Sequence, residues 1–103
     1  GYNLGIHDAI PQDYQLALKW NKRAANQGHA SSQYQLAVMY GEGKGVPQNY
    51  VLAYKWLNLA AAQGYEKADE SRDKTANEMT PSQIQEAQKL AREFKPKKEK
   101  PKK

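Results

Sequence analysis

The chain has no cysteine among its 103 residues, and valine and isoleucine are scarce. The lack of cysteine excludes disulfides and thiolate metal sites, and it leaves the redox compartment open. No apolar run approaches the roughly 20 residues that a membrane-spanning helix needs. There is no starting Met and no signal peptide, so we expect a processed form or a piece of a longer protein. Hydrophobic residues make up 39% of the chain, a share typical of thin helical stacks rather than of a thick sheet core.

The body of the chain also lacks net charge. The formal net charge is +5, but residues 95–103 alone hold six lysines and one glutamate. Residues 1–94 therefore sum to zero, and the pI of about 9.4 does not indicate a basic binding face there. Because the tail contains only Lys, Pro and Glu, it buries too little surface to offset the entropy of ordering. Residues 95–103 are thus predicted to be disordered.

Two roles are open to this tail. It could attract polyanions such as nucleic acid, anionic lipid or an acidic protein by neutralising their phosphates or carboxylates, or it could serve only as a solubilising end. No aromatic residue is interleaved to stack on bases, which argues against specific nucleic-acid recognition. The lysines that would make a nonspecific contact are Lys95, Lys97, Lys98, Lys100, Lys102 and Lys103.

What the chain does contain is a repeated block. Residues 11–28 and 47–64 are offset by 36 positions and agree at eleven of them. A fixed period of this length indicates stacked supersecondary units, because one such unit is too small to bury its own apolar face. Stacked units present an extended surface. The repeat therefore predicts a binding scaffold without naming the partner.

Each copy of the block has the pattern of an amphipathic helix. The first opens on Pro11, which is favourable at a helix start, and closes on Gly28, a helix stop. A second helix is expected over 29–40, followed by a glycine-rich loop. The stripe that should face the core has three- and four-residue spacing. Its members are Tyr14, Ala17, Trp20 and Ala24 in the first copy and Tyr50, Ala53, Trp56 and Ala60 in the second.

The two ends of the chain depart from this pattern. Residues 1–10 align with 37–46 and look like the end of an earlier, degenerate unit, in which His7 and Ala9 replace two loop glycines, so we expect a loop of different shape. Residues 66–79 offer few apolar positions and predict a weak core face. Thr80 begins a capping-box pattern with proline at the first helical position, which predicts a helix that covers the open end of the stack.

These elements predict an all-α fold, an α-α superhelix or solenoid with a capping helix and a disordered tail. The predicted domain covers 1–94, and further units could lie upstream of it. Its parts are the partial repeat 1–10, the repeats 11–46 and 47–80, and the capping helix 81–94.

The repeated motifs follow a recognisable order. Gly-x-Gly-Val-Pro-Gln-x-Tyr is followed by Ala-x-x-Trp and Ala-Ala-x-Gln-Gly, and Leu-Ala-x-Met-Tyr precedes the loop. This order resembles the Sel-1-like repeat, a relative of the tetratricopeptide repeat, over about residues 1–94. The residues that carry the resemblance are Leu36, Met39, Tyr40, Gly43, Gly45, Val46, Pro47, Gln48, Tyr50, Ala53, Trp56, Ala60, Ala61, Gln63 and Gly64.

The resemblance implies an α-solenoid of helix-turn-helix units that mediates protein-protein contacts, frequently as an adaptor. In bacteria such proteins often act in the envelope or in host interaction. A periplasmic or secreted location is implied for this chain by the resemblance alone. The first loop and the polar stretch 66–79 depart from the family pattern.

Candidate chemical sites are few. Trp20 and Trp56 are predicted to pack between helices rather than to stack on a ligand, since burying such rings is strongly favourable. The loop GEGKG lacks the Ser/Thr ending and the preceding strand of a phosphate-binding loop. Its glycines are therefore interpreted as turn residues.

The titratable residues do not form a catalytic arrangement either. His7 and His29 are the only groups that could act as bases at neutral pH, and His29 shares its repeat position with Tyr65, which indicates a packing role at the turn. Asp69 and Asp73 lie near oppositely charged neighbours and are interpreted as solvated charge. We predict no enzyme activity, no metal site and no cofactor.

Positions that differ between the two copies are the candidates for partner contact, together with the matched pair Lys19 and Lys55 on the same helices. By analogy with related solenoids, the first helix of each pair lines the concave face; drift on a solvated surface is the alternative. Leu18 and Tyr54 are favoured because exposed large apolar or aromatic groups suit binding hot spots. The candidates are Gln15, Leu18, Lys19, Lys22, Val51, Tyr54, Lys55 and Asn58.

The sequence thus predicts a non-enzymatic protein-protein interaction scaffold or adaptor, expected as a monomer, with a protein partner of unknown identity. The rival is an accessory polyanion-binding protein in which the tail acts and the repeats only dock it. Deleting residues 95–103 separates the two. A small hydrolase or lyase is a third hypothesis, which the sequence argues against because it contains no arrangement of a nucleophile and a base.

Overall fold

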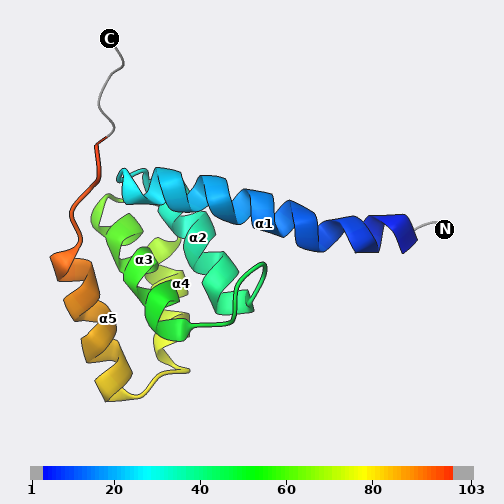
Figure 1. Cartoon of the computed structure of the whole chain (residues 1–103). Coiled ribbons are helices and arrows are strands. Elements are labelled where there is room, and N and C mark those ends of the chain that lie inside the picture. Colours follow the sequence, from blue (N-terminus) through cyan, green and yellow to red (C-terminus); the bar gives the residue numbers. More distant parts are fainter. Residues whose placement is uncertain (1–3, 99–103) are drawn as a thin grey trace, which may run out of the picture.

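The structure is a computed structural model that describes residues 4–98, and within that range it contains helices and no strand. Figure 1 shows α3 at the centre of the assembly, and α3 contacts α2, α4 and α5, while α1 contacts α2. The predicted all-α solenoid is confirmed. The helices are α1 (Leu4–Asn26), α2 (Ala30–Glu42), α3 (Tyr50–Ala62), α4 (Ala68–Ala76) and α5 (Pro81–Glu93).

Helix α1 begins upstream of Pro11, so the predicted helix start at that proline is wrong. Between α2 and α3 the chain turns at Gly43 and Gly45, whose φ angles are 70° and 78°. His7 and Ala9 stand at the equivalent positions before Pro11, and residues with a Cβ disfavour such angles, so the helix continues and the expected loop does not form. The interior proline costs about 3 kcal/mol through its lost hydrogen bond and its ring. The N-terminal half of α1 projects away from the other helices (Figure 1).

The two copies of the block end in the same turn. Gly28 and Gly64 both have positive φ, 99° and 82°. In each copy the N–H of the residue after the glycine donates back to an alanine carbonyl in the last helical turn, which is the long bond of a Schellman motif. These bonds run from His29 to Ala24 and from Tyr65 to Ala60, each at 3.1 Å. The predicted helix stops at both glycines are confirmed.

The core lies between α1, α2 and α3. Trp56 is 5% exposed, and its ring meets the Phe94 ring edge-on with a centroid distance of 5.4 Å. Phe94 directly follows α5, so the capping helix closes the core beside α3. Trp56 is thus a core residue as predicted. The buried cluster consists of Ala25, Leu36, Ala37, Trp56 and Leu57.

Helix α4 has the weak core face that was predicted. Ala68 is its one buried residue. Polar contacts add to this small apolar contact: Arg72 donates to the Asn58 side-chain oxygen at 3.2 Å, and the hydroxyls of Tyr34 and Ser71 are 3.3 Å apart. The short polar helix thus has side-chain hydrogen bonds to α2 and α3 in addition to its one buried alanine.

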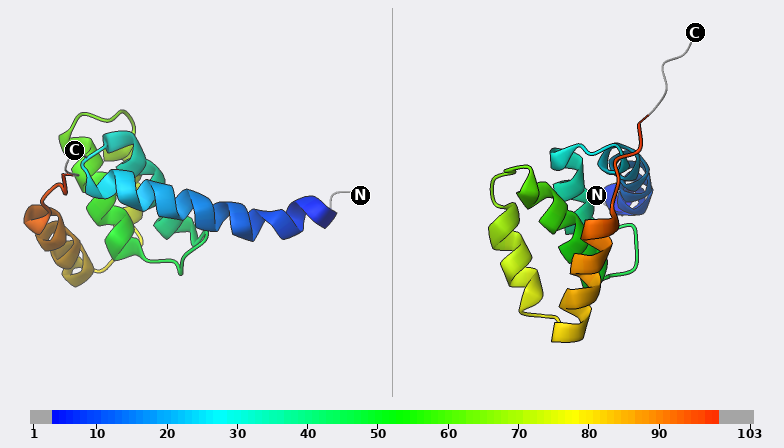
Figure 2. Two further views of the ribbon diagram at one scale, coloured as in Figure 1. Left: turned by 45° about the horizontal axis from the view of Figure 1, so that its top comes forward. Right: turned by 90° about the vertical axis from the view of Figure 1, so that its left-hand side faces the viewer.

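Helix α5 begins with the predicted capping box. The Gln83 N–H donates to the Thr80 hydroxyl oxygen at 3.1 Å, and the Thr80 N–H donates to the Gln83 side-chain oxygen at 2.9 Å. Ala87 and Ala91 are the buried residues of the helix. Their small side chains let α5 approach α3 closely, which confirms a capping helix at this end of the stack (Figure 2).

Candidate partner-binding surfaces

The predicted partner residues of α1 lie at the surface, with one exception. Lys19 and Lys22 are exposed, and exposed Gln15 donates its side-chain N–H to the Gly45 carbonyl at 3.1 Å. Leu18 is half-buried and packs against the core cluster. The exposed side chains at these positions are therefore polar or positively charged.

The glycine loop before α3 is built onto α1. A Cβ at Gly45 would lie 3.1 Å from both the Cβ and the carbonyl oxygen of Tyr14, so a side chain there would require Tyr14 to shift. The Lys44 ammonium pairs with the Glu42 carboxylate at 2.9 Å and lies 5.7 Å from the centroid of the Tyr14 ring. Glu42 raises the pKa of Lys44 above its usual value. The loop glycines thus serve turn geometry and close packing.

Tyr54 is buried, so its predicted exposure is wrong. Its side chain is 7% exposed, and its hydroxyl accepts a hydrogen bond from the Gln88 side chain of α5 at 3.3 Å. The reason is the capping helix, which covers this side of α3. Leu18, at the equivalent position of α1, is also turned into the stack. The difference between Leu18 and Tyr54 therefore reflects different neighbours in the fold.

The remaining candidates on α3 are half-buried. The Lys55 ammonium lies 4.4 Å from the centroid of the Trp56 ring and 5.8 Å from that of Phe94. Burial lowers the pKa of Lys55 below its usual value. Asn58 is bonded to α4, and Val51 is also half-buried. The predicted concave face is therefore more open on α1 than on α3.

The beginning of the tail returns to α1. The Lys97 N–H donates to the Asn26 carbonyl at 2.6 Å. A Cβ at Gly28 would lie 3.5 Å from Pro96, so the proline ring rests against the turn that follows α1. Residues 95–98 follow α5 outside any helix, and the predicted contact residues Lys100, Lys102 and Lys103 lie outside the described residues. Figure 1 shows the chain rising from α5 past the C-terminal end of α1.

This return brings the cationic side chains of two separate segments together. A small hollow at the end of α1 is lined by Arg23, Asn26, Gln27 and Lys97. On the other side of α3, α4 carries an acidic first turn (Figure 2). We call the cationic region the basic surface. Its exposed members are Lys19, Lys22, Arg23, Lys95, Lys97 and Lys98.

An apolar face on α1 was not predicted. Leu16 is 56% exposed and Trp20 is 51% exposed, so the predicted core position of Trp20 is wrong. The Lys19 ammonium lies 5.4 Å from the centroid of the Trp20 ring, and the Arg23 guanidinium 5.8 Å. The four-residue spacing of Leu16 and Trp20 is typical of two residues on one helix face. Because Trp20 and Trp56 occupy matching positions of the repeat, both were predicted to lie in the core.

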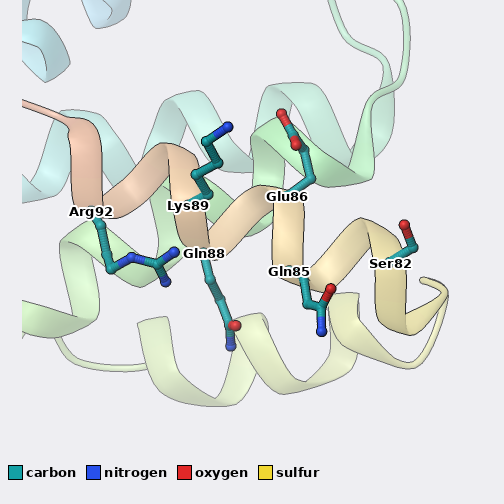
Figure 3. Close-up of a pocket in the computed structure, with 6 residues that line it drawn as sticks. All are labelled: Ser82, Gln85, Glu86, Gln88, Lys89 and Arg92. Atoms are coloured by element: carbon teal, nitrogen blue, oxygen red, sulfur yellow. The ribbon is translucent and has the colours of Figure 1, made fainter.

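A polar hollow on α5 was also not predicted. Figure 3 shows its side chains along one helix, with Glu86 and Lys89 on one side and Gln85 and Gln88 on the other. The hollow contains both charge signs and has donors and acceptors for peptide groups. In the sequence, this hollow is indicated by the polar positions on the side of the helix opposite to Ile84. It is lined by Ser82, Gln85, Glu86, Gln88, Lys89 and Arg92.

The groups considered for catalysis are dispersed. His29 is exposed at the start of α2, while Tyr65 at its equivalent position packs on Tyr34 with a ring-centroid distance of 5.1 Å. Asp69 and Asp73 are exposed and lie 3.6 and 3.5 Å from Arg72, which fits solvated charge. The side chain of His7 lies outside the described part. Among the described residues no His, Asp or Glu cluster could hold a metal ion.

The repeated helix pairs and their shared turn agree with a comparison to known families. Residues 1–29 and 30–65 match the Sel1 repeat. The chain belongs to the Sel1 repeat family. Proteins of this family are generally protein-interaction scaffolds and are typically not enzymes. This Sel1-repeat chain thus has its predicted family confirmed.

A solved structure supports the same fold. The crystal structure of c5321, a protective antigen present in uropathogenic Escherichia coli strains and displaying an SLR fold, is similar with a TM-score of 0.76 and 32% sequence identity. The similarity covers 90% of this chain and 21% of that one, so the chain spans about a fifth of its length. No curated protein matches the chain. Within residues 4–98, every helix is too short or too polar to cross a membrane.

Proposed function

We propose that this Sel1-repeat chain is a protein-interaction scaffold or adaptor that receives an acidic segment of a partner protein on its basic surface. The hydrogen bond from the Lys97 N–H to the Asn26 carbonyl carries this proposal. It holds the start of the tail at the end of α1, where Lys97 lines one hollow with Arg23, a residue distant from it in the sequence. A tail free of α1 would offer no such combined surface.

The chemistry of the basic surface favours carboxylates. Charge-assisted hydrogen bonds from lysine and arginine to carboxylates are short and are about twice as strong as neutral ones. Each exposed ion pair is worth at most about 1 kcal/mol, so useful affinity needs several pairs at once. Binding should therefore weaken steeply as salt is added.

The other predicted residues have smaller parts in this proposal. Lys19 and Lys22 are direct contacts, because both are exposed. Gln15, Val51, Lys55 and Asn58 stay predicted contacts at the margin, since each is either half-buried or already hydrogen-bonded. Leu18 and Tyr54 are omitted because they pack within the stack.

The experiment compares three altered chains with the unaltered protein. One carries Lys19→Glu with Lys22→Glu, one lacks residues 95–103, and one carries Lys74→Glu as the matched control on exposed α4. Binding is measured by titration with a glutamate-rich peptide, and separately with heparin and duplex DNA, at low and moderate salt. We expect the first two changes to weaken peptide binding and the control to leave it unchanged.

The outcomes separate this function from its rival. Unchanged peptide binding in both the double variant and the shortened chain would contradict the proposal. Binding of heparin and DNA that depends on residues 95–103 but not on Lys19 and Lys22, without peptide binding, would support the polyanion-binding alternative. Circular dichroism of each variant verifies that the helices are retained.

A further inference from the structure

The turns that end the two copies of the block have the same backbone geometry. The first turn covers residues 26–29 and the second covers the matched residues 62–65. Their three backbone hydrogen bonds measure 3.1, 3.0 and 3.1 Å in the first turn and 3.1, 2.9 and 3.1 Å in the second. The Gln63 side-chain N–H donates to the Gly28 carbonyl at 2.9 Å, so the turns are neighbours. A segment that fits one turn therefore meets the same backbone shape at the other.

The first turn carries a segment of the tail, Lys95-Pro96-Lys97. A Cβ placed on Gly28 would lie 3.5 Å from the Pro96 side chain, so the proline ring packs on the glycine. The Lys97 N–H donates to the Asn26 carbonyl at 2.6 Å, which gives a partner to a carbonyl at the end of α1. The tail segment is thus held by a proline ring and one N–H, and it runs opposite to the direction of the turn.

The second turn has no such cover in the described part of the chain. A Cβ placed on Gly64 would meet no atom within 4 Å. Ala62 takes the place of Asn26, and within residues 4–98 no backbone N–H beyond α3 donates to its carbonyl. The glycine and the carbonyl that hold the tail at the first turn are therefore both open at the second.

Beside the second turn is a hollow of about 420 Å³. The rings of Tyr34 and Tyr65 line it, with centroids 5.1 Å apart and planes inclined at 33°. Helix α4 begins later after its turn than α2 does, so Glu66 remains in the turn and lines the hollow with Lys67. Tyrosine rings and a carboxylate are groups that hold an ammonium.

The second turn also differs from the first in charge. Residues 64–70 hold three acidic side chains and one lysine, whereas the matched residues 28–34 hold no Asp, Glu, Lys or Arg. Asp69 and Glu70 lie 3.6 and 3.8 Å from cations of α4 itself. Glu66 is exposed and has no ion pair within residues 4–98. A lysine from outside should therefore be attracted more strongly to the second turn than to the first.

We infer that the second turn binds the tail of another copy of this chain through the segment Lys100-Pro101-Lys102. The proline ring packs on Gly64, and the N–H of the lysine after it donates to the Ala62 carbonyl. These are the contacts that the same three residue types make at the first turn.

The direction of the seated segment places the remaining lysine. Pro96 meets Gly28 and Lys97 meets Asn26, so the residue before the proline lies toward the chain that follows the glycine. At the second turn that chain is Tyr65 and Glu66. The lysine before the proline thus lies over a tyrosine ring and pairs with a carboxylate.

The sequence supplies this occupant. The tail contains Lys-Pro-Lys twice, at 95–97 and at 100–102, and the second lies outside the described residues. The first is seated on its own chain, and the described tail passes the end of α1, whereas the second turn joins α3 to α4 (Figure 1). We therefore assign the second segment to the turn of a neighbouring copy. This head-to-tail contact is small and weak, and it does not depend on the proposed function.

The test measures self-association of the 103-residue chain. Sedimentation velocity is recorded over a concentration series up to about 1 mM, since small contacts lie at the weak end of protein interfaces. We expect the mean sedimentation coefficient to rise with concentration. Removing residues 99–103, which leaves the seated segment in place, should abolish the rise. Pro101→Ala keeps every charge and should reduce the rise, because it removes the ring.

A change in the turn tests the other half of the contact. Glu66→Lys should weaken association about fivefold or more, because an ion pair is lost and a like charge is added. Glu78→Lys makes the same change of charge at an exposed residue between α4 and α5 and is the matched control. It should leave association unchanged. Circular dichroism of each variant verifies that the helices are retained.

Mixing two defective chains tests the head-to-tail arrangement. The chain without residues 99–103 keeps an intact turn, and the Glu66→Lys chain keeps an intact tail. Each should remain a monomer when alone at a concentration at which the unaltered chain associates. The mixture should form one-to-one dimers and nothing larger, because only one productive contact is left.

Amide NMR signals locate the contact within the chain. The signals of Gly64 and Tyr65 should shift as the concentration of the unaltered chain rises. The signal of Gly28 should not shift, because Pro96 already covers it.

Four results would overturn the inference. Association could be absent over the whole series, or Glu66→Lys and Glu78→Lys could weaken it equally, which would indicate a general effect of charge. The Gly28 signal could shift in place of the Gly64 signal. Finally, removal of residues 99–103 could shift the Gly64 signal in a dilute, monomeric sample, which would make the chain's own tail the occupant.

Discussion

Helices α1 and α3 carry the same tyrosine, alanine and tryptophan stripe, yet their tryptophans differ tenfold in exposed fraction, 51% for Trp20 and 5% for Trp56. The difference lies in their neighbours. α3 contacts α2, α4 and α5, whereas α1 contacts mainly α2. In a solenoid each repeat contacts only adjacent repeats, so burial belongs to a position in the stack as much as to a residue type.

The largest expected effect is the difference in stability between alanine substitutions at the two tryptophans. Trp56→Ala should lower the free energy of unfolding by about 3–5 kcal/mol, because it removes a buried ring and leaves a cavity. Trp20→Ala should change it by at most about 1 kcal/mol, as is usual away from the core. Urea unfolding followed by circular dichroism measures both. Equal losses would show that the two positions have the same surroundings in solution.

A glycine in the loop should have the next largest effect. Gly45→Ala should cost at least about 1–2 kcal/mol, because φ is 78° and Tyr14 must move. Ala9→Gly at the matched position should instead reduce the helical signal of α1 and leave the thermal midpoint of the core nearly unchanged. A large shift of that midpoint in the Ala9→Gly chain would contradict the comparison.

The two glutamines should differ by a smaller amount. Gln63→Ala should cost about 1–3 kcal/mol, because the side-chain oxygen of Gln33, which is 1% exposed, loses a donor. Gln27→Ala should stay within about 0.5 kcal/mol. Chemical denaturation of both variants supplies the measurement. A loss at Gln27 as large as that at Gln63 would indicate a contact that the structure does not contain.

The smallest effect concerns two matched lysines and depends on pH. Burial lowers the pKa of Lys55 below its usual value, so between the lowered and the usual pKa the unfolded chain binds more protons than the folded one. This contribution to stability should rise as the pH increases through the lowered pKa. Lys55→Met should remove the rise, and Lys19→Met should leave it intact. Unfolding midpoints measured over a pH series provide the comparison, and a falling contribution would contradict it.

Local signals predicted much of the fold. The capping box at Thr80 and the stops at Gly28 and Gly64 depend on hydrogen bonds within a few residues, so their patterns were sufficient. The start at Pro11 was predicted wrongly because proline tolerates two positions here, a helix start and, at a cost, a helix interior. The missing glycines at positions 7 and 9 decided between them.

The candidate surface was less predictable, because it depends on which helix covers which. Tyr54 and Trp20 have nearly the reverse of their predicted exposures, since α5 covers the one and no described helix covers the other. Lys19 and Lys22 remained exposed as expected. The proximity of Arg23 to Lys97 follows from the backbone bond to Asn26, for which the tail carries no sequence motif.

The sequence by itself determined the repeat, its family, the helix stops at Gly28 and Gly64 and the capping helix, because helical periodicity and capping depend on residues within one or two turns of chain. Only the tertiary structure decided which copy of the stripe is core, and that the lysine tail returns to α1. Both depend on the order in which helices stack. Identical side chains on α1 and α3 thus differ in burial because one helix lies inside the stack and the other at its open face.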